Sequence, residues 1–592
     1  MPAEPRPEVL VAGAGPVGLT AAHELARRGL RVRLVDAAAG PARTSRAVAV
    51  HPRTLETLDQ MGVVGSLRER GRENRAFTMF ASGRRLVRLE ADYSSMPTRY
   101  PFSLIVEQAA TEAVLREAAA ARGVAVEWGV KVTGFEQHAD FVRVRLERSD
   151  GGTETVRADW LVGCDGGHST VRKQLGLPLI GKSRDTWMLA DAPVRTSLPP
   201  DSIYWAHTGG QALMMVPYAR EGHWRLLDTA PGTRGATGAR ESLSRRLSAG
   251  LGRQVAVGEP EWTSVFTFQQ RMVPRMHEGR VFVAGDAAHV HSPASGQGMN
   301  TGIQEAYNLA WKLADVARGH AGRQLLDTYS EERVPVGRAL LGSTRTATFL
   351  VQFKNVLAAA ALPVVFAVVR TVPPLRRALQ RKVLGGMSGL RVGYGDSSLS
   401  LPVPTRRTAR PPLSGAGSRI RRRGAAGLPL PSDDGAGCAV PGARASAAAA
   451  VHAGEPGPDA LAAELRDTRW TLLWSKGGAT AARAALWAAA AHGDWLSVRT
   501  VGARPGTAPH PLPDPGRTLR DTLGLDAGGW LLIRPDGYVA ARGPQLTGQR
   551  WRHTLAALGL GDRRSALKDS SSVLRADPDR MLSTIAGRED SR

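Results

Sequence analysis

A glycine turn near the N-terminus limits the folds open to this chain more than any other feature. The apolar segment 9–12 is followed by Gly13, Gly15 and Gly18 in the G-x-G-x-x-G register, and then by an amphipathic segment. A strand, this turn and a helix form the dinucleotide-binding fingerprint of a parallel α/β sheet. Asp36 ends a second apolar strand and is expected to accept hydrogen bonds from ribose hydroxyls. A glycine turn that binds nothing is the alternative, and this context disfavours it.

The length and charge of the chain restrict its class. A chain of 592 residues is too long for one core, so we expect at least two domains and favour three. The formal net charge of +24 raises the question of a nucleic-acid partner. We expect none, because arginine is scattered over the whole chain and no basic stripe alternates with stacking aromatic residues.

The cysteines and apolar segments give further expectations. Cys164 and Cys438 are far apart, so neither a disulfide framework nor a metal site is expected. Residues 1–8 lack the apolar core of a signal peptide, which favours a cytoplasmic location. The apolar run 356–369 is interrupted by Pro363 and is too short to cross a bilayer. We predict a buried helix pair there without stable membrane insertion, and a peripheral membrane contact is the lesser alternative.

Short strands interrupt the α/β rhythm in two places. Residues 77–80 and 85–89 suggest one strand pair, and the alternating segments 124–128 and 141–146 suggest a half-exposed hairpin. Between residues 179 and 268 short strands dominate, which predicts a sheet laid down as a separate lobe.

Two further strand ends carry residues suited to a ligand. The segment 160–166 forms a strand that ends in a glycine turn at Asp165 and Gly166, and Gly285 and Asp286 follow the strand 281–284. An open α/β sheet places its ligand crevice at the carboxyl ends of its strands, so the three sites can converge on one ligand. The backbone of 296–300, at the start of a long helix, would bring N–H groups to an electron-rich ring edge.

These three motifs, in this order, resemble those of the class A flavoprotein aromatic hydroxylases, which include para-hydroxybenzoate hydroxylase and phenol hydroxylase. The resemblance covers about the first 345 residues. It implies an α/β fold: a Rossmann-like FAD-binding domain, an inserted β-sheet substrate domain and a C-terminal thioredoxin-like domain that lacks redox cysteines. It also implies FAD contacts from Gly13, Gly15, Pro16, Val17, Gly18, Asp36, Arg46, Gln108, Asp165, Gly285, Asp286, Gly298, Met299 and Asn300. Asp165 stands in the family's dual FAD/NADPH motif, and no second dinucleotide domain is evident, so NADPH or NADH is expected to dock transiently.

Several of these residues have a plainer interpretation. Arg46 could be a solvated loop arginine. His289 is better explained as a helix-end hydrogen-bonding residue than as a general base, and the case for His291 beside the flavin is weak.

The predicted domain boundaries follow from these patterns. The FAD-binding domain takes residues 1–76, 104–178 and 275–345, and the substrate domain 77–103 and 179–274. A helical segment (346–400), a linker rich in Pro, Gly and Arg (401–435), the thioredoxin-like domain (436–560) and a disordered tail (561–592) follow.

The resemblance implies a monooxygenase reaction. NAD(P)H would reduce FAD, O2 would form a flavin C4a-hydroperoxide, and one oxygen atom would pass to a bulky phenolic or polyketide-type aromatic substrate. The pocket candidates are Tyr204, Trp205, Tyr218 and Pro293, together with Trp187 and Trp224; no catalytic side chain is assigned. Baeyer–Villiger oxygen insertion is the alternative within this fold, and a flavin-binding protein without turnover or a nucleic-acid-binding protein are the alternatives outside it. A homodimer stays open.

Overall fold

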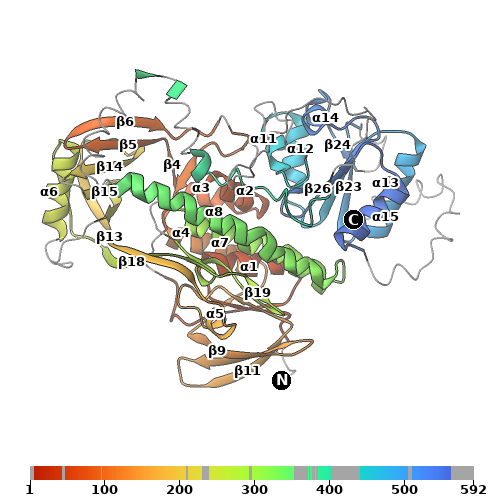
Figure 1. Ribbon diagram of the computed structural model, residues 1–592, viewed down its shortest axis with the longest axis horizontal. Coiled ribbons are helices and arrows are strands. Elements are labelled where there is room, and N and C mark those ends of the chain that lie inside the picture. Colours follow the sequence, from red (N-terminus) through yellow and green to blue (C-terminus); the bar gives the residue numbers. More distant parts are fainter. Residues whose placement is uncertain are drawn as a thin grey trace, which may run out of the picture.

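The described residues of the computed structural model form five β-sheets with helices packed against them (Figure 1). The structure describes residues 6–42, 47–94, 96–208, 211–229, 239–291, 296–352, 371–372, 374–375, 381, 384–402, 440–451, 453–503 and 510–561. In these ranges, no helix has the length and apolar character needed to cross a membrane.

A six-stranded sheet contains the glycine turn. Its strands, in spatial order, are β19 (His277–Glu278), β20 (Val281–Val283), β12 (Trp160–Gly163), β1 (Val9–Ala12), β2 (Val32–Asp36) and β8 (Val126–Trp128). All neighbours run parallel except β19 and β20. The central strands β1 and β12 are wholly buried, as expected for a parallel sheet covered on both faces. The predicted Rossmann-like sheet is therefore confirmed.

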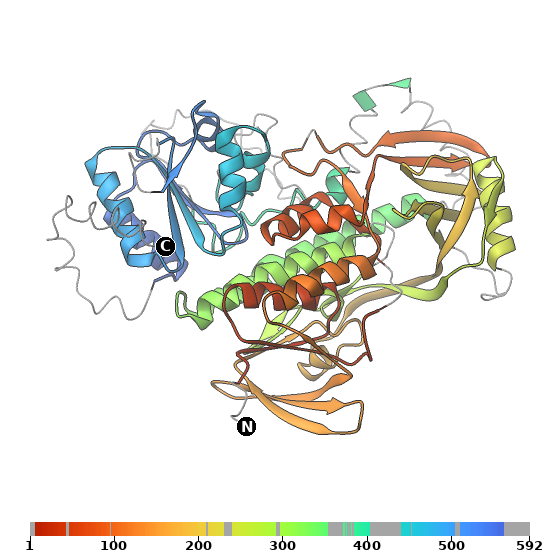
Figure 2. The ribbon, with the colours of Figure 1, turned by 180° about the vertical axis from the view of Figure 1, so that it is seen from behind.

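Three helices pack together beside this sheet. They are α1 (Pro16–Arg27), α4 (Gln108–Ala120) and α7 (Gln297–Ala317), and α1 contacts both of the others (Figure 2). Leu19, Ala22 and Leu25 of α1 are buried because their spacing of three residues keeps them on one face of the helix. The short helix α5 (Thr170–Gln174) follows β12.

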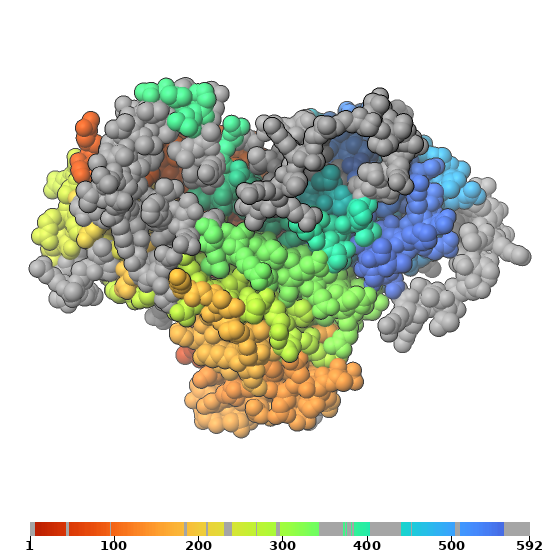
Figure 3. Space-filling view, viewed as in Figure 1, coloured from red at the N-terminus to blue at the C-terminus, as the bar shows by residue number. Residues whose placement is uncertain are grey.

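The predicted hairpin between 124–128 and 141–146 is wrong. β8 pairs in parallel with β2 at the edge of the six-stranded sheet. β10 (Val142–Arg148) instead pairs with β9 (Val130–Gln137) and β11 (Thr153–Ala158) in a separate three-stranded antiparallel sheet. This sheet projects from the molecule and is drawn in orange at the bottom of Figure 3. The short apolar run 124–128 carries no signal that distinguishes β2 from β10 as its neighbour. Tertiary packing decides which strand it pairs with.

A large, mainly antiparallel sheet forms the predicted lobe. Its strands, in spatial order, are β21 (His289–Val290), β18 (Trp262–Met272), β13 (Ile180–Thr196), β16 (His223–Asp228), β15 (Gln211–Pro217), β14 (Ser202–Thr208), β5 (Ala76–Ala81) and β6 (Arg84–Glu90), with β17 (Val255–Val257) paired to β13. Helix α6 (Ala239–Leu251) covers one face, through Leu243, Leu247 and Leu251. The opposite face packs on Val48, Ala49 and Ile105.

Ala49 and Ile105 belong to a small connecting sheet, and Val48 directly precedes its first strand. It consists of β3 (Ala49–Val50), β7 (Ser103–Ile105) and β4 (Arg72–Asn74). Helices α2 (Pro52–Gln60) and α3 (Val64–Glu69) follow β3, and α2 contacts α7. This sheet thus links the large sheet to the helix that begins at residue 297.

The C-terminal unit contains a five-stranded sheet. Its strands, in spatial order, are β24 (Pro511–Leu512), β23 (Leu496–Val501), β22 (Trp470–Ser475), β25 (Trp530–Ile533) and β26 (Val539–Gly543). Its helices are α11 (Ser446–Val451), α12 (Pro456–Glu464), α13 (Ala479–His492), α14 (Thr518–Leu523) and α15 (Gly548–Leu558). Its tryptophan-rich core includes Trp311 of α7, so this unit shares a core with the nucleotide-binding part. The thioredoxin-like assignment stays a prediction.

The domain boundaries also stay predictions. α8 (Asp327–Gln352) extends beyond residue 345, and β21, within the segment 275–345, joins the large sheet. Most of the predicted linker 401–435, the tail from residue 562, the run 356–369 and Cys438 lie outside the described residues.

Candidate functional site

The three glycines of the turn meet different surroundings, as the fingerprint requires. Gly13 has φ +101°, and a Cβ there would lie 2.3 Å from the carbonyl oxygen of Cys164. A Cβ on Gly18 would lie 1.8 Å from the carbonyl oxygen of Gly13. A Cβ on Gly15 would meet no atom within 4 Å. Gly13 and Gly18 are therefore needed for close backbone packing, whereas Gly15 faces open space at the N-terminus of α1.

Pro16 and Val17 continue the turn into the helix. Pro16 stands in the first turn of α1, where its missing N–H costs nothing. A Cβ on Gly285 or on Gly302 would lie within 2.8 Å of Val17 Cγ2. Val17 thus joins the first motif to the third and to α7, through packing.

Asp36 holds the glycine turn from the end of β2. Its Oδ2 accepts a hydrogen bond from the backbone N–H of Ala14 at 2.6 Å, and its Oδ1 accepts one from Ala38 at 2.8 Å. The carboxylate is therefore beside the turn, where a ribose would lie next to a bound pyrophosphate.

Asp165 caps a helix in this structure. Its Oδ2 accepts hydrogen bonds from the backbone N–H groups of Thr170 (2.7 Å) and Val171 (3.1 Å) at the start of α5. Arg172 of the same helix donates to the carbonyl oxygens of Gly167 at 2.9 Å and Ala287 at 3.4 Å. The second motif is thereby tied to the third.

Glu305 orders the third motif, and the sequence analysis missed it. This fully buried residue of α7 accepts hydrogen bonds from the backbone N–H of Gly285 (Oε2, 2.9 Å) and forms an ion pair with Nε2 of His289 (Oε1, 2.7 Å). Glu305 thereby binds residues on both sides of Asp286, and Asp286 itself is exposed. Burial alone would lower the pKa of His289, but Glu305 raises it above its usual value. His289 is thus a structural hydrogen-bonding partner, as in its plainer interpretation, but it lies in β21 and not at a helix end.

The first turn of α7 lies against the connecting sheet. Gly296, with φ +61°, starts the helix, and a Cβ on Gly298 would meet nothing within 4 Å. The side chain of Asn300 accepts from the backbone N–H of His51 at 2.8 Å and donates to the carbonyl oxygen of Ala49 at 2.8 Å. Asn300 therefore fixes the helix start to β3. Met299 packs on the main core.

The predicted loop contacts are described in part. Gln108 stands at the start of α4, and its Oε1 accepts a hydrogen bond from the backbone N–H of Ala47 at 3.2 Å. Arg46 and Pro293 lie outside the described residues. Cys164 is partly buried, and its burial raises the pKa of its thiol well above its usual value.

The structure separates the two pocket candidates of β14. Trp205 packs with Trp187 and Tyr218 on the face toward the connecting sheet. Tyr204 and Trp224 point the other way and pack under α6, and the hydroxyl of Tyr204 donates to the carbonyl oxygen of Pro199 at 2.7 Å. Neighbouring residues of a strand face opposite sides, so Tyr204 and Trp224 cannot line a pocket with Trp205. Tyr204 and Trp224 could line a pocket only on the α6 side of the sheet, and their role there stays a prediction.

A buried polar group stands on the same face as Trp205. Arg225 pairs with Asp191 (2.5 Å), and the hydroxyl of Tyr218 donates to Asp191 at 2.9 Å. The guanidinium also lies over the rings of Tyr218 and Trp262. Burial raises the pKa of Tyr218 well above its usual value, so its phenol stays neutral.

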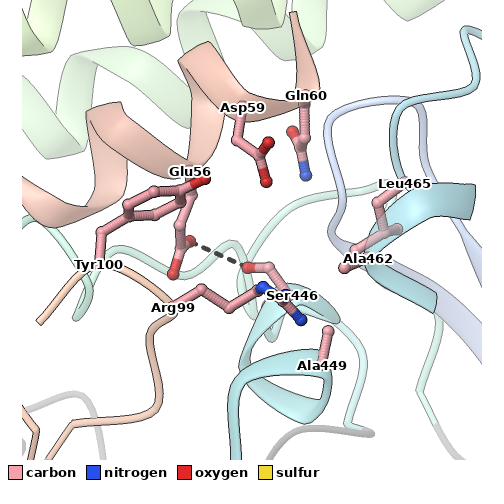
Figure 4. A pocket seen from close by; sticks show the side chains of 9 residues that line it. All are labelled: Glu56, Asp59, Gln60, Arg99, Tyr100, Ser446, Ala449, Ala462 and Leu465. Atoms are coloured by element: carbon pink, nitrogen blue, oxygen red, sulfur yellow. Dashed lines mark hydrogen bonds between the residues drawn. The ribbon is translucent and has the colours of Figure 1, made fainter. Parts of the chain in front are cut away.

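A small cavity lies elsewhere, between α2 and the C-terminal unit (Figure 4). Its volume of about 20 Å³ suits a water molecule and excludes an aromatic ring. It is lined by Glu56, Asp59, Gln60, Arg99, Tyr100, Ser446, Ala449, Ala462 and Leu465, none of which is a predicted site residue.

The converging strand ends fit FAD. Gly15 and Gly298 leave open space beside the first turns of α1 and α7, where backbone N–H groups lack acceptors within the helix. Asp36 and the turn around Asp286 supply carboxylates for hydroxyl groups. The residues at the two helix starts therefore suit a nucleotide phosphate at α1 and a flavin ring edge at α7.

Comparisons with known proteins agree with this fit. A family model described as FAD binding domain matches residues 6–344. The 6-methylpretetramide 4-monooxygenase of Streptomyces rimosus is 47% identical over 575 residues, which are 97% of each chain. The anhydrotetracycline monooxygenase of Streptomyces rimosus is 35% identical over 358 residues, covering 58% of this chain and 70% of that one.

Solved structures show the same architecture. The anhydrotetracycline hydroxylase OxyS from Streptomyces rimosus has a TM-score of 0.68 at 28% identity, over 94% of this chain and 99% of that one. A ternary complex of aklavinone-11 hydroxylase with FAD and aklavinone has a TM-score of 0.69 at 25% identity, over 93% and 99%. The chain therefore belongs to the FAD-dependent aromatic monooxygenases, whose FAD binding domain it carries over residues 6–344.

Proposed function

We propose that this chain hydroxylates a fused-ring phenolic polyketide of the 6-methylpretetramide type. The observation that carries the proposal is the 47% identity to 6-methylpretetramide 4-monooxygenase over 97% of both chains, which includes the substrate sheet and the C-terminal unit. FAD is the cofactor, and NAD(P)H and O2 are the co-substrates of this enzyme class.

The chain's own residues bind and orient the cofactor. Gly13 and Gly18 shape the turn, and Gly15 leaves room for the pyrophosphate at the start of α1, where the helix dipole favours its charge. The first turn of α7, at 298–300, offers backbone N–H groups to the flavin pyrimidine edge. Asp36 and Asp286 hold hydroxyl groups of the cofactor, and Arg46, Gln108 and Asp165 complete the proposed set. Bound FAD would supply the redox chemistry by which one oxygen atom of O2 reaches an aromatic ring.

The large sheet supplies the substrate side. The flat apolar side chains of Trp187 and Trp205 are buried on the face toward β3, a strand that contacts α7. A fused aromatic ring system gains burial and stacking from such surfaces. The same walls exclude water from the reacting atoms, which an oxygen-transfer site needs. Tyr218 and Pro293 stay pocket candidates.

NAD(P)H is proposed to dock transiently, with Asp165 near its path. A homodimer and a place in the cytoplasm also stay predictions. Size-exclusion chromatography with light scattering tests the dimer.

The decisive experiment starts from the visible spectrum of the purified protein, followed by anaerobic NADPH titration with and without 6-methylpretetramide. We expect a flavin spectrum whose bleaching the substrate accelerates, and a product that gains one ¹⁸O from ¹⁸O2. A hydroxylated ring in the NMR spectrum supports the proposal, whereas a ring-expanded lactone of the same mass would mean Baeyer–Villiger insertion. A protein that stays colourless after incubation with FAD would refute the proposal.

A further inference from the structure

Helix α7 extends from the proposed flavin site to the C-terminal unit. It runs without a break over the 21 residues Gln297–Ala317 and therefore spans about 30 Å. Its first turn carries the backbone of 298–300, and its second half lies beside the C-terminal unit, seen to its right in Figure 1. A continuous helix transmits a displacement of one end to the other end.

One face of the second half of α7 contacts the C-terminal unit through polar side chains. Asn308 Nδ2 and Trp311 Nε1 donate to Asp536 Oδ2 at 3.0 and 3.1 Å. Trp470 Nε1 donates to Asp315 Oδ2 at 2.8 Å. Residues 308, 311 and 315 follow the three-to-four-residue spacing of one helix face. Asp536 lies in the turn between β25 and β26.

Four buried charges alternate in sign at this contact. Lys312 of α7 donates to Glu332 of α8 at 2.7 Å, and Arg534 binds Glu332 through two hydrogen bonds of 2.5 and 2.9 Å. Arg534 also donates to Asp536 at 2.9 and 2.5 Å. The exposed fraction of each of these four side chains is 3% or less. Two cations and two anions thus neutralise one another without solvent.

A second route runs from the same turn to the first turn of α7. The guanidinium of Arg534 lies over the ring of Tyr394, 4.9 Å from its centroid. The hydroxyl of Tyr394 accepts a hydrogen bond from Arg333 at 2.9 Å. Arg333 in turn donates to the carbonyl oxygen of Thr301 at 3.3 Å. Thr301 adjoins Asn300, whose side chain fixes the helix start to β3.

We propose that the β25–β26 turn of the C-terminal unit, through Arg534 and Asp536, positions α7 and thereby sets the affinity and the electronic environment of the flavin. Arg534 and Asp536 are positioning residues, because they act through α7. The proposal rests on the flavin site proposed above at 298–300.

The chemistry of the contact supports this role. An apolar contact holds two elements together but tolerates sliding, whereas buried charges permit only the arrangement in which each one is paired. A shift of α7 by a fraction of a turn would leave Lys312, Glu332 or Asp536 without its partner. The network therefore selects one register for the helix, which a site made of backbone N–H groups requires.

The test compares Arg534→Met with Arg520→Met. Arg520 pairs with Asp514 at 3.0 Å inside the C-terminal unit and does not touch α7 in any contact of the described residues, so it is a matched control. FAD affinity is measured by fluorescence titration of the apoprotein, and the visible spectrum and reduction potential of the bound flavin are recorded. We expect Arg534→Met to raise the Kd for FAD by about tenfold or more and to shift the potential. Arg534→Lys should restore part of both.

The Kd for FAD and the flavin potential of the two variants decide whether Arg534 positions α7. Arg520→Met should lower the melting temperature yet leave the Kd and the potential at wild-type values. Equal Kd and potential in Arg534→Met and wild type would overturn the inference. Asp536→Asn, which changes one charge without changing shape, and Trp470→Phe carry the test if Arg534→Met does not fold. A wild-type protein that binds no FAD would instead refute the flavin site itself.

Discussion

At the scale of single residues, the three glycines of the fingerprint separate folding from binding. Gly15→Ala places a methyl group in open space, so the apoprotein should lose no more than about 0.5 kcal/mol of unfolding free energy. The same methyl group would occupy the place of a phosphate, and the Kd for FAD should rise at least about tenfold. Thermal unfolding of the apoprotein and FAD titration measure the two effects.

The matched change is Gly18→Ala. Its methyl group would lie 1.8 Å from the carbonyl oxygen of Gly13, which is backbone and cannot move aside. We expect destabilisation of about 3 kcal/mol or more, already in the absence of FAD. Equal melting temperatures for the two apoprotein variants would contradict this distinction.

Glu305 gives a second prediction at this scale. Glu305→Ala leaves the buried His289 and the N–H of Gly285 without their acceptor, which should cost about 3 kcal/mol. Glu305→Gln keeps an acceptor for Gly285 and should cost less. Denaturant unfolding of both variants checks the order, and a smaller loss in Glu305→Ala than in Glu305→Gln would contradict the role assigned to Glu305.

At the scale of elements, β14 places neighbouring aromatic residues on opposite faces. Trp205→Phe should raise the KM for the aromatic substrate several-fold, because the indole faces the proposed pocket. Tyr204→Phe removes a hydrogen bond under α6 and should cost about 1 kcal/mol of stability while leaving KM unchanged. Steady-state kinetics and thermal melts separate the two. A KM that rises only in Tyr204→Phe would reverse the assignment of the faces.

The same contrast shows how far the sequence predicts the fold. The sequence predicts motifs that depend on backbone geometry, such as the turn at Gly13 with its positive φ, because glycine alone tolerates those positions. The pairing of β8 and the inward face of β14 were not visible, because short apolar runs do not specify partners or faces. Glu305 looked like an ordinary helix glutamate. Its role follows from the turn at 285–289 that it meets across the core, which no local pattern encodes.

At the scale of the whole molecule, the C-terminal unit is built onto the nucleotide-binding part. Trp311 of α7 packs edge-on against Trp470 of β22 and belongs to the core of that unit. Arg444 of the C-terminal unit makes a buried ion pair with Glu56 of α2. The unit is therefore expected to unfold together with the FAD-binding part. This shared core could not be predicted from the sequence, because it joins residues more than 150 positions apart.

His320 makes this junction sensitive to pH. Its Nδ1 lies 3.6 Å from Oδ1 of Asp315, next to the end of α7, and its Nε2 lies 3.3 Å from Oδ2 of Asp494 in the C-terminal unit. Partial burial opposes its charge, but the two carboxylates raise the pKa of His320 above its usual value. A raised pKa in the folded state stabilises the fold at pH values below the ordinary pKa of about 6.5, and this gain is lost as the pH rises through the folded-state value.

His320→Gln should therefore remove a pH-dependent contribution of about 1 kcal/mol. Melting temperatures of wild type and His320→Gln are compared at pH 6 and at pH 8.5. The melting temperature of the wild type should be the higher one at pH 6. At pH 8.5 the two melting temperatures should be equal, because the neutral imidazole no longer attracts Asp315 and Asp494. His277, which lies beside Asp327 away from this junction, serves as the control, since His277→Gln leaves the contact between α7 and the C-terminal unit intact. A gap between wild type and His320→Gln that stays constant over this range would mean that His320 holds the junction by packing on Trp495 rather than by charge.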